Sequence, residues 1–404
     1  MDVLPLVIVT HVLHPAVTQG FLPAAHRLGV PVVLLTDHRL SHLEYFSQNV
    51  SFAPLEIMEC DVFNPISIIN ALQSAGIQPA AIFSNSDHLQ TSTALAAEYF
   101  DLPAKDWRVC YAAKNKAAMR QRLGERNLPS PWFLTLMPGQ AVPADAPYPL
   151  IVKPREGVAS LDVHLCENAP DARRYVEQFW QRQPGRALLL ESFMSGPLFT
   201  LETLGDGEHT VAVGGFDVDL SESPHFIELE ARWNGPVCYR VQQQALSQVI
   251  AFGVGFGVCH SEFILTESGP VLVEINYRSI GDGREFMLDR VYGGCWFENI
   301  LRLHLGQSLV LKSPSWQSAM VRYYVADQGG RLAHAADDHE RSFERAHATY
   351  HGFRHSGDDV HLTRSNKDYL GMLSVIAESE IDLAQAVTQM EPQLTWKMDS
   401  ERSV

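Results

Sequence analysis

The sequence predicts an α/β protein, because strand-like and helix-like patterns alternate along its first hundred residues. Residues 4–10, 31–36 and 80–83 are short apolar runs typical of buried strands, and residues 16–28 have the apolar spacing of a helix. This alternation favours a small doubly wound unit with a parallel sheet. The unit lacks the Gly-x-Gly-x-x-Gly turn of dinucleotide-binding proteins, which argues against a dinucleotide-dependent reductase.

Length and proline content suggest how the chain is divided. Its 404 residues are enough for two or three domains with cores of their own. We expect a boundary near residues 105–110 and another break at residues 312–316. The division that follows is an N-terminal domain of residues 1–105, a central part of residues 106–312, and a smaller C-terminal part of residues 313–404.

Two acidic strands in the central part carry the clearest chemical signal. Glu274 and Asn276 are two residues apart on one predicted strand, so their side chains share a face. Glu262 lies on the preceding strand and could join them across a short hairpin. Three hard oxygen ligands suit Mg²⁺ better than zinc or calcium. We expect Val273 and Ile275 on the opposite, buried face; the alternative interpretation is a surface hairpin with ordinary charges.

Segments that could hold a nucleotide precede this hairpin. Lys153 ends a short buried strand, and the small-residue loop over residues 155–163 could bring backbone N–H groups close to phosphate oxygens. Lys116 begins an amphipathic run with helical spacing. Residues 187–194 read as a strand that runs into a hinge, whose backbone could contact an adenine. Each segment, taken alone, is also compatible with ordinary structure.

The order of these parts resembles the ATP-grasp superfamily and, within it, the carboxylate–amine ligases that join amino acids into dipeptides. The resemblance covers most of residues 1–310. It implies an N-terminal doubly wound domain, a two-subdomain ATP-grasp core over residues 106–312 with a lid at about residues 110–190, and a small C-terminal subdomain. The implied reaction is ADP-forming amide-bond formation through an acyl phosphate, in the biosynthesis of small molecules.

The resemblance also implies roles for individual residues. The metal ligands would be Glu262, Glu274 and Asn276, holding Mg²⁺ or Mn²⁺. The ATP contacts would be Lys116, Lys153, Gly157, Ala159, Ser160, Glu191, Ser192, Phe193 and Met194. Arg278 would stabilise the transferring phosphoryl group, and His260 is either the general base or a packed core histidine. Substrate contacts would come from Glu228, Glu230, Ser279, Gly281, Gly283 and Arg284, although Arg284 could instead form an ion pair with Asp282 or Glu285.

Four positions depart from the family pattern. Ala159 and Asp162 replace glycines of the phosphate loop, and Asp162 would bring a carboxylate close to the phosphates unless it points away. Leu198 stands where many relatives carry a glutamate for the ribose, and Tyr277 stands where proline is usual. Two alternatives therefore remain: another ATP-grasp reaction, such as carboxylation or kinase-type transfer, and a non-catalytic nucleotide-binding scaffold.

Composition points to the kind of partner. A net charge of −16 argues against nucleic acid and anionic membranes as partners. The small-molecule carboxylate and amine expected as partners are what the family resemblance implies. The six cysteines are scattered without a CxxC pair, as expected of reduced thiols in the cytoplasm. Six histidines crowd into residues 334–361, and we expect them to be solvated. Relatives are commonly dimers, so the resemblance also allows a homodimer.

Overall fold

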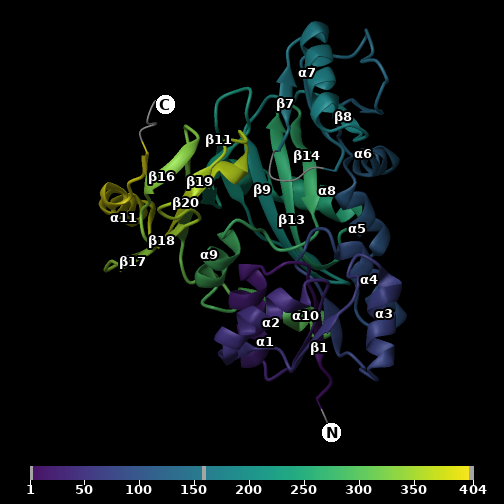
Figure 1. Ribbon diagram of the computed structural model, residues 1–404, viewed down its shortest axis with the longest axis vertical. Coiled ribbons are helices and arrows are strands. Elements are labelled where there is room, and N and C mark those ends of the chain that lie inside the picture. The colour runs from purple at the N-terminus through teal and green to yellow at the C-terminus, as the bar shows by residue number, and fades with distance from the viewer. Residues whose placement is uncertain (1–2, 157–160, 400–404) are drawn as a thin grey trace.

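The computed structural model describes residues 3–156 and 161–399, and it confirms the mixed α/β fold class (Figure 1). The N-terminal part is a parallel sheet in the order β3-β2-β1-β4. Its strands are β1 (Leu6–Val9), β2 (Val32–Thr36), β3 (Glu56–Glu59) and β4 (Ala81–Phe83). Its helices are α1 (Leu22–Arg27), α2 (Arg39–Gln48), α3 (Pro65–Ser74) and α4 (Gln90–Tyr99). A π-helical segment, Ala16–Phe21, precedes α1 and fills the first half of the predicted helix.

A small antiparallel sheet in the order β5-β8-β6-β7 forms the upper end of the molecule in Figure 1. Its strands are β5 (Phe133–Leu136), β6 (Leu150–Pro154), β7 (His164–Cys166) and β8 (Leu188–Ser192). Helix α7 (Ala169–Arg182) covers one face and packs Val176 and Phe179 against the strands. Asn168 caps this helix, because its side chain accepts a hydrogen bond from the backbone of Asp171.

The largest sheet has ten strands and runs through the middle of the molecule. The path is β14-β13-β9-β11-β12-β15-β20-β18-β17, and β10 pairs with β9. In chain order the strands are β9 (Leu198–Asp206), β10 (Thr210–Gly214), β11 (Phe216–Leu220), β12 (Glu228–Trp233), β13 (Phe256–Thr266), β14 (Gly269–Asn276), β15 (Ser318–Val325), β17 (His339–Ser342), β18 (Ala346–Gly352) and β20 (Tyr369–Ala377). Residues on both sides of the expected boundary at 312 share this sheet, because Ala231 of β12 pairs with Val321 of β15. The division into domains stays a prediction.

Helices cover the large sheet and fix its acidic strands. Helices α5 (Trp107–Lys114), α6 (Lys116–Glu125) and α8 (Pro236–Phe252) pack on β9, β13 and β14 through one apolar cluster. Within it, the rings of Phe199 and Phe263 stack with their centroids 5.2 Å apart. The remaining helices are α9 (Arg284–Val291), α10 (Trp296–His304) and α11 (Glu380–Met390), and a three-stranded sheet joins β16 (Gly330–His334), β19 (Asp359–Val360) and β21 (Lys397–Met398). Within the described ranges, no helix has both the length and the apolar character needed to cross a bilayer.

The predicted hairpin is present, but a bulge changes which side chains it buries. Glu262 pairs with Glu274, whereas the next residue of β13, Phe263, pairs with Leu272. Val273 is therefore the extra residue of a β-bulge. Leu272 and Ile275 enter the core, and Val273 lines a cavity on the other side. The expectation that Val273 shares the buried face with Ile275 is wrong, because the bulge interrupts the two-residue period.

Candidate active site

A cavity with about 950 Å³ of unfilled space lies between the small sheet and the acidic end of the large sheet. Both sheets and helix α6 contribute to its wall. The lining residues are Lys116, Ile151, Lys153, Pro154, Leu161, Val163, Glu191, Ser192, Phe193, Met194, Leu198, Leu220, Phe226, Glu228, Glu262, Ile264, Val273 and Glu274. One part of this wall is apolar and the rest is ionic, which suits a ligand that has a flat apolar group and a charged tail.

The predicted metal ligands come together at the ionic end of the cavity. Glu262 and Glu274 stand opposite each other on β13 and β14, and Asn276 is opposite His260 two pairs further along. Asn276 Nδ2 donates a hydrogen bond to Glu262 Oε1 at 3.3 Å. Two carboxylates and the amide oxygen of Asn276 form a set of hard donors, and such a set fits Mg²⁺.

Lys116 connects this group to helix α6. Its Nζ lies 2.8 Å from Glu274 Oε1, and the side chain is almost fully buried. Burial would lower the pKa of Lys116, but Glu274 more than offsets it, so the pKa is raised and the ammonium stays charged. Lys116 takes the first position of α6 because Asn115 caps the helix by accepting hydrogen bonds from Ala117 N and Ala118 N. The predicted helix at this lysine is confirmed.

A buried ionic cluster forms the opposite wall of the cavity. Glu191 Oε1 lies 2.6 Å from Arg120 Nε, and Glu191 Oε2 lies 2.5 Å from Lys153 Nζ. Burial alone would raise the pKa of Glu191, but Arg120 and Lys153 outweigh it and hold that pKa at about 2. Lys153 has a lowered pKa, because burial outweighs the attraction of Glu191. The carboxylate therefore aims the ammonium of Lys153 at the cavity.

Arg120 is a site residue that the sequence analysis missed. Its guanidinium also donates to Val273 O at 2.8 Å and to Leu272 O at 3.3 Å, the two carbonyls at the bulge of β14. A bulge leaves backbone groups without ladder partners, and Arg120 satisfies them. One buried arginine thus joins helix α6, the small sheet and β14, the metal strand, which carries the predicted metal ligands Glu274 and Asn276. The only sequence signal was an arginine on the helix that begins at Lys116.

His260 is held by two glutamates. Its Nδ1 lies 2.7 Å from Glu202 Oε1, and its Nε2 lies 3.5 Å from Glu262 Oε1. Burial would lower the pKa of His260, but Glu202 and then Glu262 raise it to about 9. These two contacts fix the ring between carboxylates, and the role of His260 as a general base stays a prediction. Its contact with Glu262 orients one of the predicted metal ligands. Glu202, fully buried on β9, was also missed.

The hinge residues line the cavity where the apolar wall begins. Ser192 ends β8, and Phe193 N donates to Pro149 O at 2.9 Å. Met194 and Leu198 line the same wall. The apolar side chain of Leu198 thus faces the cavity at the position where many relatives carry a glutamate for the ribose. Three predicted ATP contacts, Gly157, Ala159 and Ser160, lie outside the described residues.

Asp162, which departs from the family pattern, does not point its carboxylate into the cavity. Its Oδ1 accepts from Arg182 Nη1 at 3.1 Å and its Oδ2 accepts from Gln183 Nε2 at 2.7 Å. Both partners lie at the C-terminal end of α7, and Arg182 balances the negative charge. The residue has a φ of 57°, a left-handed conformation that aspartate tolerates better than most residues. The expected conflict with phosphate oxygens is therefore removed.

The segment after β14 joins the metal strand to the N-terminal domain. Ser279 N donates to Asn85 Oδ1 at 3.1 Å, and Arg278 Nη1 donates to Ser279 O at 2.9 Å. Arg278 and Lys114 hold the pKa of Asp87 below its usual range against the effect of burial. Ser279 is fully buried, and its Oγ accepts from Trp296 Nε1 at 3.1 Å. Arg278 is therefore near the N-terminal sheet, and Ser279 has a structural role.

Tyr277 replaces the proline of the family motif and anchors this segment. Its hydroxyl accepts hydrogen bonds from Gly255 N and Phe256 N, both at 3.2 Å. Its carbonyl accepts from Lys105 Nζ at 2.5 Å, and the same ammonium lies 4.5 Å from the centre of the tyrosine ring. Burial lowers the pKa of Lys105 to about 8. The substitution thus brings a buried lysine under the metal strand.

The predicted substrate residues divide into two groups. Glu228 lines the cavity, and its Oε2 lies 2.9 Å from Nη2 of the buried Arg284. Glu230, in contrast, pairs with Arg322 at 2.5 Å and Arg232 at 2.8 Å and does not line the cavity. Arg284 does form an ion pair, as one alternative held, but with Glu228 and not with Asp282 or Glu285.

The two predicted substrate glycines follow Ser279. Gly283 has a φ of 83° and its missing side chain leaves room for the Met372 methyl group, because an added Cβ would lie 2.5 Å from it. Gly281 has open space around it, with Arg278 as the nearest neighbour at 3.8 Å from an added Cβ. The positive φ is thus the stronger reason for glycine at position 283, whereas Gly281 keeps the approach to Arg278 open.

Comparison with known proteins agrees with this arrangement. No protein-family model matches the chain. The chain is 25% identical to y4rH, an uncharacterised protein of Sinorhizobium fredii, over 78% of this chain and 66% of that protein. It is also 25% identical to carnosine synthase 1 of Gallus gallus, over 78% of this chain and 37% of that protein. It therefore spans about two thirds of the first relative and little more than a third of the second.

Solved structures decide the fold. The L-amino acid ligase of Bacillus licheniformis superposes with a TM-score of 0.76 over 99% of this chain and 100% of that chain, at 16% identity. The chain has the ATP-grasp fold. The biotin carboxylase domain of the Hydrogenobacter thermophilus 2-oxoglutarate carboxylase, solved with Mg-ADP and bicarbonate, superposes with a TM-score of 0.68 over 98% of this chain and 91% of that chain, at 14% identity. The ATP-grasp resemblance inferred from the sequence is confirmed.

Proposed function

We propose that this ATP-grasp protein is an ADP-forming carbon–nitrogen ligase that joins a small-molecule carboxylate to an amine. The observation that carries the proposal is the cross-strand pair Glu262–Glu274, with Asn276 beside it and two buried lysines on the same cavity. Buried charges are costly unless they are paired or bind a ligand, and a structural core has no use for this set. The likeness to an L-amino acid ligase supports amide formation as the reaction.

We expect ATP to bind in this cavity with its base on the apolar side and its phosphates on the ionic side. The apolar wall with Phe193, Met194 and Leu198 would take the adenine and ribose, and the ammonium groups of Lys116 and Lys153 would hold the phosphates. Glu262, Glu274 and Asn276 would hold Mg²⁺, which in phosphoryl transfer neutralises charge on the phosphate oxygens. Arg120 and Glu191 would act from outside the ligand, because they fix the direction of Lys153.

The reaction has two steps, and each step forms one bond and breaks another. A carboxylate oxygen of the first substrate attacks the γ-phosphorus, and the bond from that phosphorus to the bridging oxygen of ADP breaks. The amine nitrogen of the second substrate then attacks the acyl carbon, and inorganic phosphate leaves. Arg278 would stabilise the negative charge on the transferring phosphoryl group. The protein's main contribution is alignment and charge neutralisation.

Glu228 is the residue we assign to the amine. It lines the cavity near Glu262, so a substrate ammonium can pair with it and then release a proton to it before attack. Arg284, 97% buried, keeps Glu228 in place and is a positioning residue. Glu230 has no part in this assignment, because Arg322 and Arg232 take up its charge.

The direct test is ADP release from Mg-ATP with mixed pools of carboxylates and amines, with products read by mass. We expect ADP only when both classes are present, and a product one water lighter than their sum. Arg278→Ala should lower kcat by about a hundredfold while ATP affinity changes little, because the arginine acts where charge develops. Arg278→Lys, which keeps the positive charge, should lower kcat by a smaller factor.

Other outcomes would select the alternatives. Bicarbonate-dependent ADP release without an amine would indicate carboxylation, a reading that the likeness to a biotin carboxylase domain favours. A phosphorylated product with one substrate alone would indicate kinase-type transfer. No ADP release and no binding of Mg-ADP would indicate a non-catalytic scaffold and would end the ligase proposal.

A further inference from the structure

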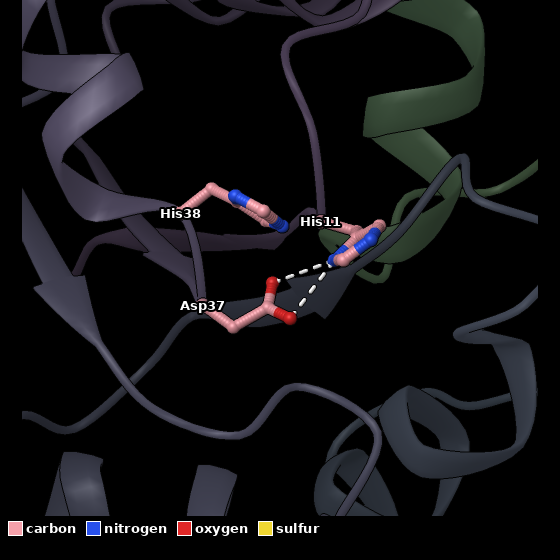
Figure 2. Close-up of side chains that lie close together, drawn as sticks. All are labelled: His11, Asp37 and His38. Carbon is pink, nitrogen blue, oxygen red and sulfur yellow. Dashed lines mark hydrogen bonds and ion pairs between the residues drawn. The ribbon is translucent and has the colours of Figure 1, made fainter.

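A cluster of two histidines and an aspartate lies at the carboxyl edge of the N-terminal parallel sheet, apart from the ATP cavity (Figure 2). His11 follows β1, and Asp37 and His38 follow β2, the strand beside it. Because parallel neighbouring strands end at the same edge, the fold itself brings these residues together. One nitrogen of each imidazole and one oxygen of the carboxylate lie within 4.8 Å of one another.

Two of the three side chains are already in contact. His11 Nδ1 lies 2.8 Å from Asp37 Oδ1 and 2.9 Å from Asp37 Oδ2, so the carboxylate faces this nitrogen with both oxygens. The rings of His11 and His38 meet edge to face with centroids 4.6 Å apart, and Figure 2 shows both rings beside the carboxylate. The ring of Phe63 supports His11 from 5.2 Å.

The side chain of Thr36 holds the segment after β1 and the segment after β2 together. Thr36 Oγ1 donates to His11 O at 2.8 Å and accepts from His38 N at 3.0 Å, so one side chain ties the two loops together. The ring of His38 makes no hydrogen bond or ion pair among residues 3–156 and 161–399. The ring of His38 lies beside the His11–Asp37 pair without a bond to either residue. Its nitrogens are therefore available to a metal ion.

We propose that His11, Asp37 and His38 bind a divalent transition-metal ion, with Zn²⁺ as the reference case, and leave at least one coordination position open. Two imidazole nitrogens and one carboxylate are borderline donors that suit Zn²⁺ and its neighbours better than Mg²⁺. The site thus differs in chemistry from the all-oxygen group of Glu262, Glu274 and Asn276. Three protein ligands with an open position are typical of zinc sites that also take water or a substrate atom.

A second group with metal-ligand chemistry exists in the described part of the chain and is less suitable. It consists of His164, Cys166 and Asp171. Cys166 is fully buried, and burial raises the pKa of its thiol to about 12, which disfavours the thiolate that a metal needs. His164 is stacked on Tyr175 with ring centroids 4.4 Å apart. The first cluster has neither obstacle.

The test is Zn²⁺ binding to the untagged full chain, measured by isothermal titration with excess Mg²⁺ to occupy the oxygen site. Wild type should bind one equivalent. His38→Ala and His11→Ala should each weaken binding at least about tenfold, the loss seen even for groups that only support a ligand. His38 is exposed, and its ring makes no hydrogen bond to the described residues, so its variant should keep the wild-type Tm in EDTA.

Two matched controls locate the ion. His351→Ala removes a histidine whose Nδ1 lies 3.0 Å from Asp338 Oδ2 but which belongs to no group of three ligands within residues 3–156 and 161–399, so Zn²⁺ affinity should not change. Glu274→Gln alters the ATP cavity and should not change it either. Co²⁺ in place of Zn²⁺ should give a visible absorption band in wild type that His38→Ala loses. Equal Zn²⁺ affinity in wild type, His38→Ala and His11→Ala would overturn the proposal, as would a loss confined to Glu274→Gln.

Discussion

Arg120 and Glu191 form an ion pair of 2.6 Å that is almost completely shielded from solvent. Arg120 lies on α6 and Glu191 on β8, so the pair crosses from the large sheet's covering helix to the small sheet. The same guanidinium donates to the two carbonyls at the bulge beside Glu274. A change at this arginine therefore affects folding and the metal strand together.

Arg120→Met should destabilise the protein by about 3 kcal/mol, because it leaves Glu191 and two backbone carbonyls without this partner. Tm by calorimetry is the measurement. Lys153 remains near Glu191, so the double variant Arg120→Met with Glu191→Leu should recover part of the loss. Arg302→Met, on a half-exposed helical arginine, is the control. An unchanged Tm in Arg120→Met would contradict the buried cluster as a source of stability.

Glu274→Gln should raise the Mg²⁺ concentration needed for half-maximal ADP release by at least about tenfold, because it removes a charged ligand. Steady-state turnover against Mg²⁺ at saturating ATP measures this. Glu267→Gln is the matched control, since Glu267 is exposed in the turn of the same hairpin. If both variants shifted the curve equally, general electrostatics and not ligation would be the cause.

Glu228→Gln should lower kcat/KM for the amine by about a hundredfold and leave the KM for ATP unchanged, because a base is lost without harm to the nucleotide site. Glu230→Gln, two residues along the same strand, should lower Tm through its lost contacts with Arg322 and Arg232. Its kinetics should match the wild type. Kinetics that changed in Glu230→Gln and not in Glu228→Gln would reverse our assignment.

Glu285 should make stability depend on pH. Its carboxyl is buried, Oε2 has no hydrogen-bond partner among the described residues, and burial raises its pKa from 4.5 to about 7. Between pH 4.5 and 7 the folded protein keeps a proton that the unfolded chain has released, so stability falls as pH rises through this window.

Glu285→Gln should remove that fall. At pH 8 the variant should be more stable than wild type by up to about 3 kcal/mol, and near pH 4.5 the two should agree. Tm across pH 4.5–8 is the measurement, with the exposed Glu44→Gln as control. If the difference in Tm between Glu285→Gln and the wild type did not depend on pH, the carboxyl of Glu285 would titrate normally.

The sequence predicted the parts of the site whose signal is local. Alternation marked the hairpin of Glu262 and Glu274, and helical spacing marked the helix of Lys116. The bulge at Val273 was not predictable, because an inserted residue leaves an apolar run apolar. Arg120 and Glu202 were missed for another reason: their partners are 71 and 58 residues away, and no spacing encodes such pairs.

Histidines show the same limit. Sequence crowding drew attention to residues 334–361, where six histidines lie close along the chain. The cluster we propose as a metal site combines His11 with Asp37 and His38, which come from different strand ends and become neighbours only through β1–β2 pairing. Proximity along the chain was thus a poor guide, and the order of strands in the sheet was the information needed.

The ten-stranded sheet has a mechanical consequence for catalysis. Glu228 on β12 and Glu262 on β13 belong to one hydrogen-bonded sheet, with β9 and β11 between them, so their separation is as rigid as that sheet. Lys153 belongs to a separate sheet, which has no ladder to the large one in the part of the chain that the structure describes. The predicted substrate and metal residues therefore share one rigid framework, and Lys153 is tied to that framework by side chains, through Glu191 and Arg120, and not by strand pairing.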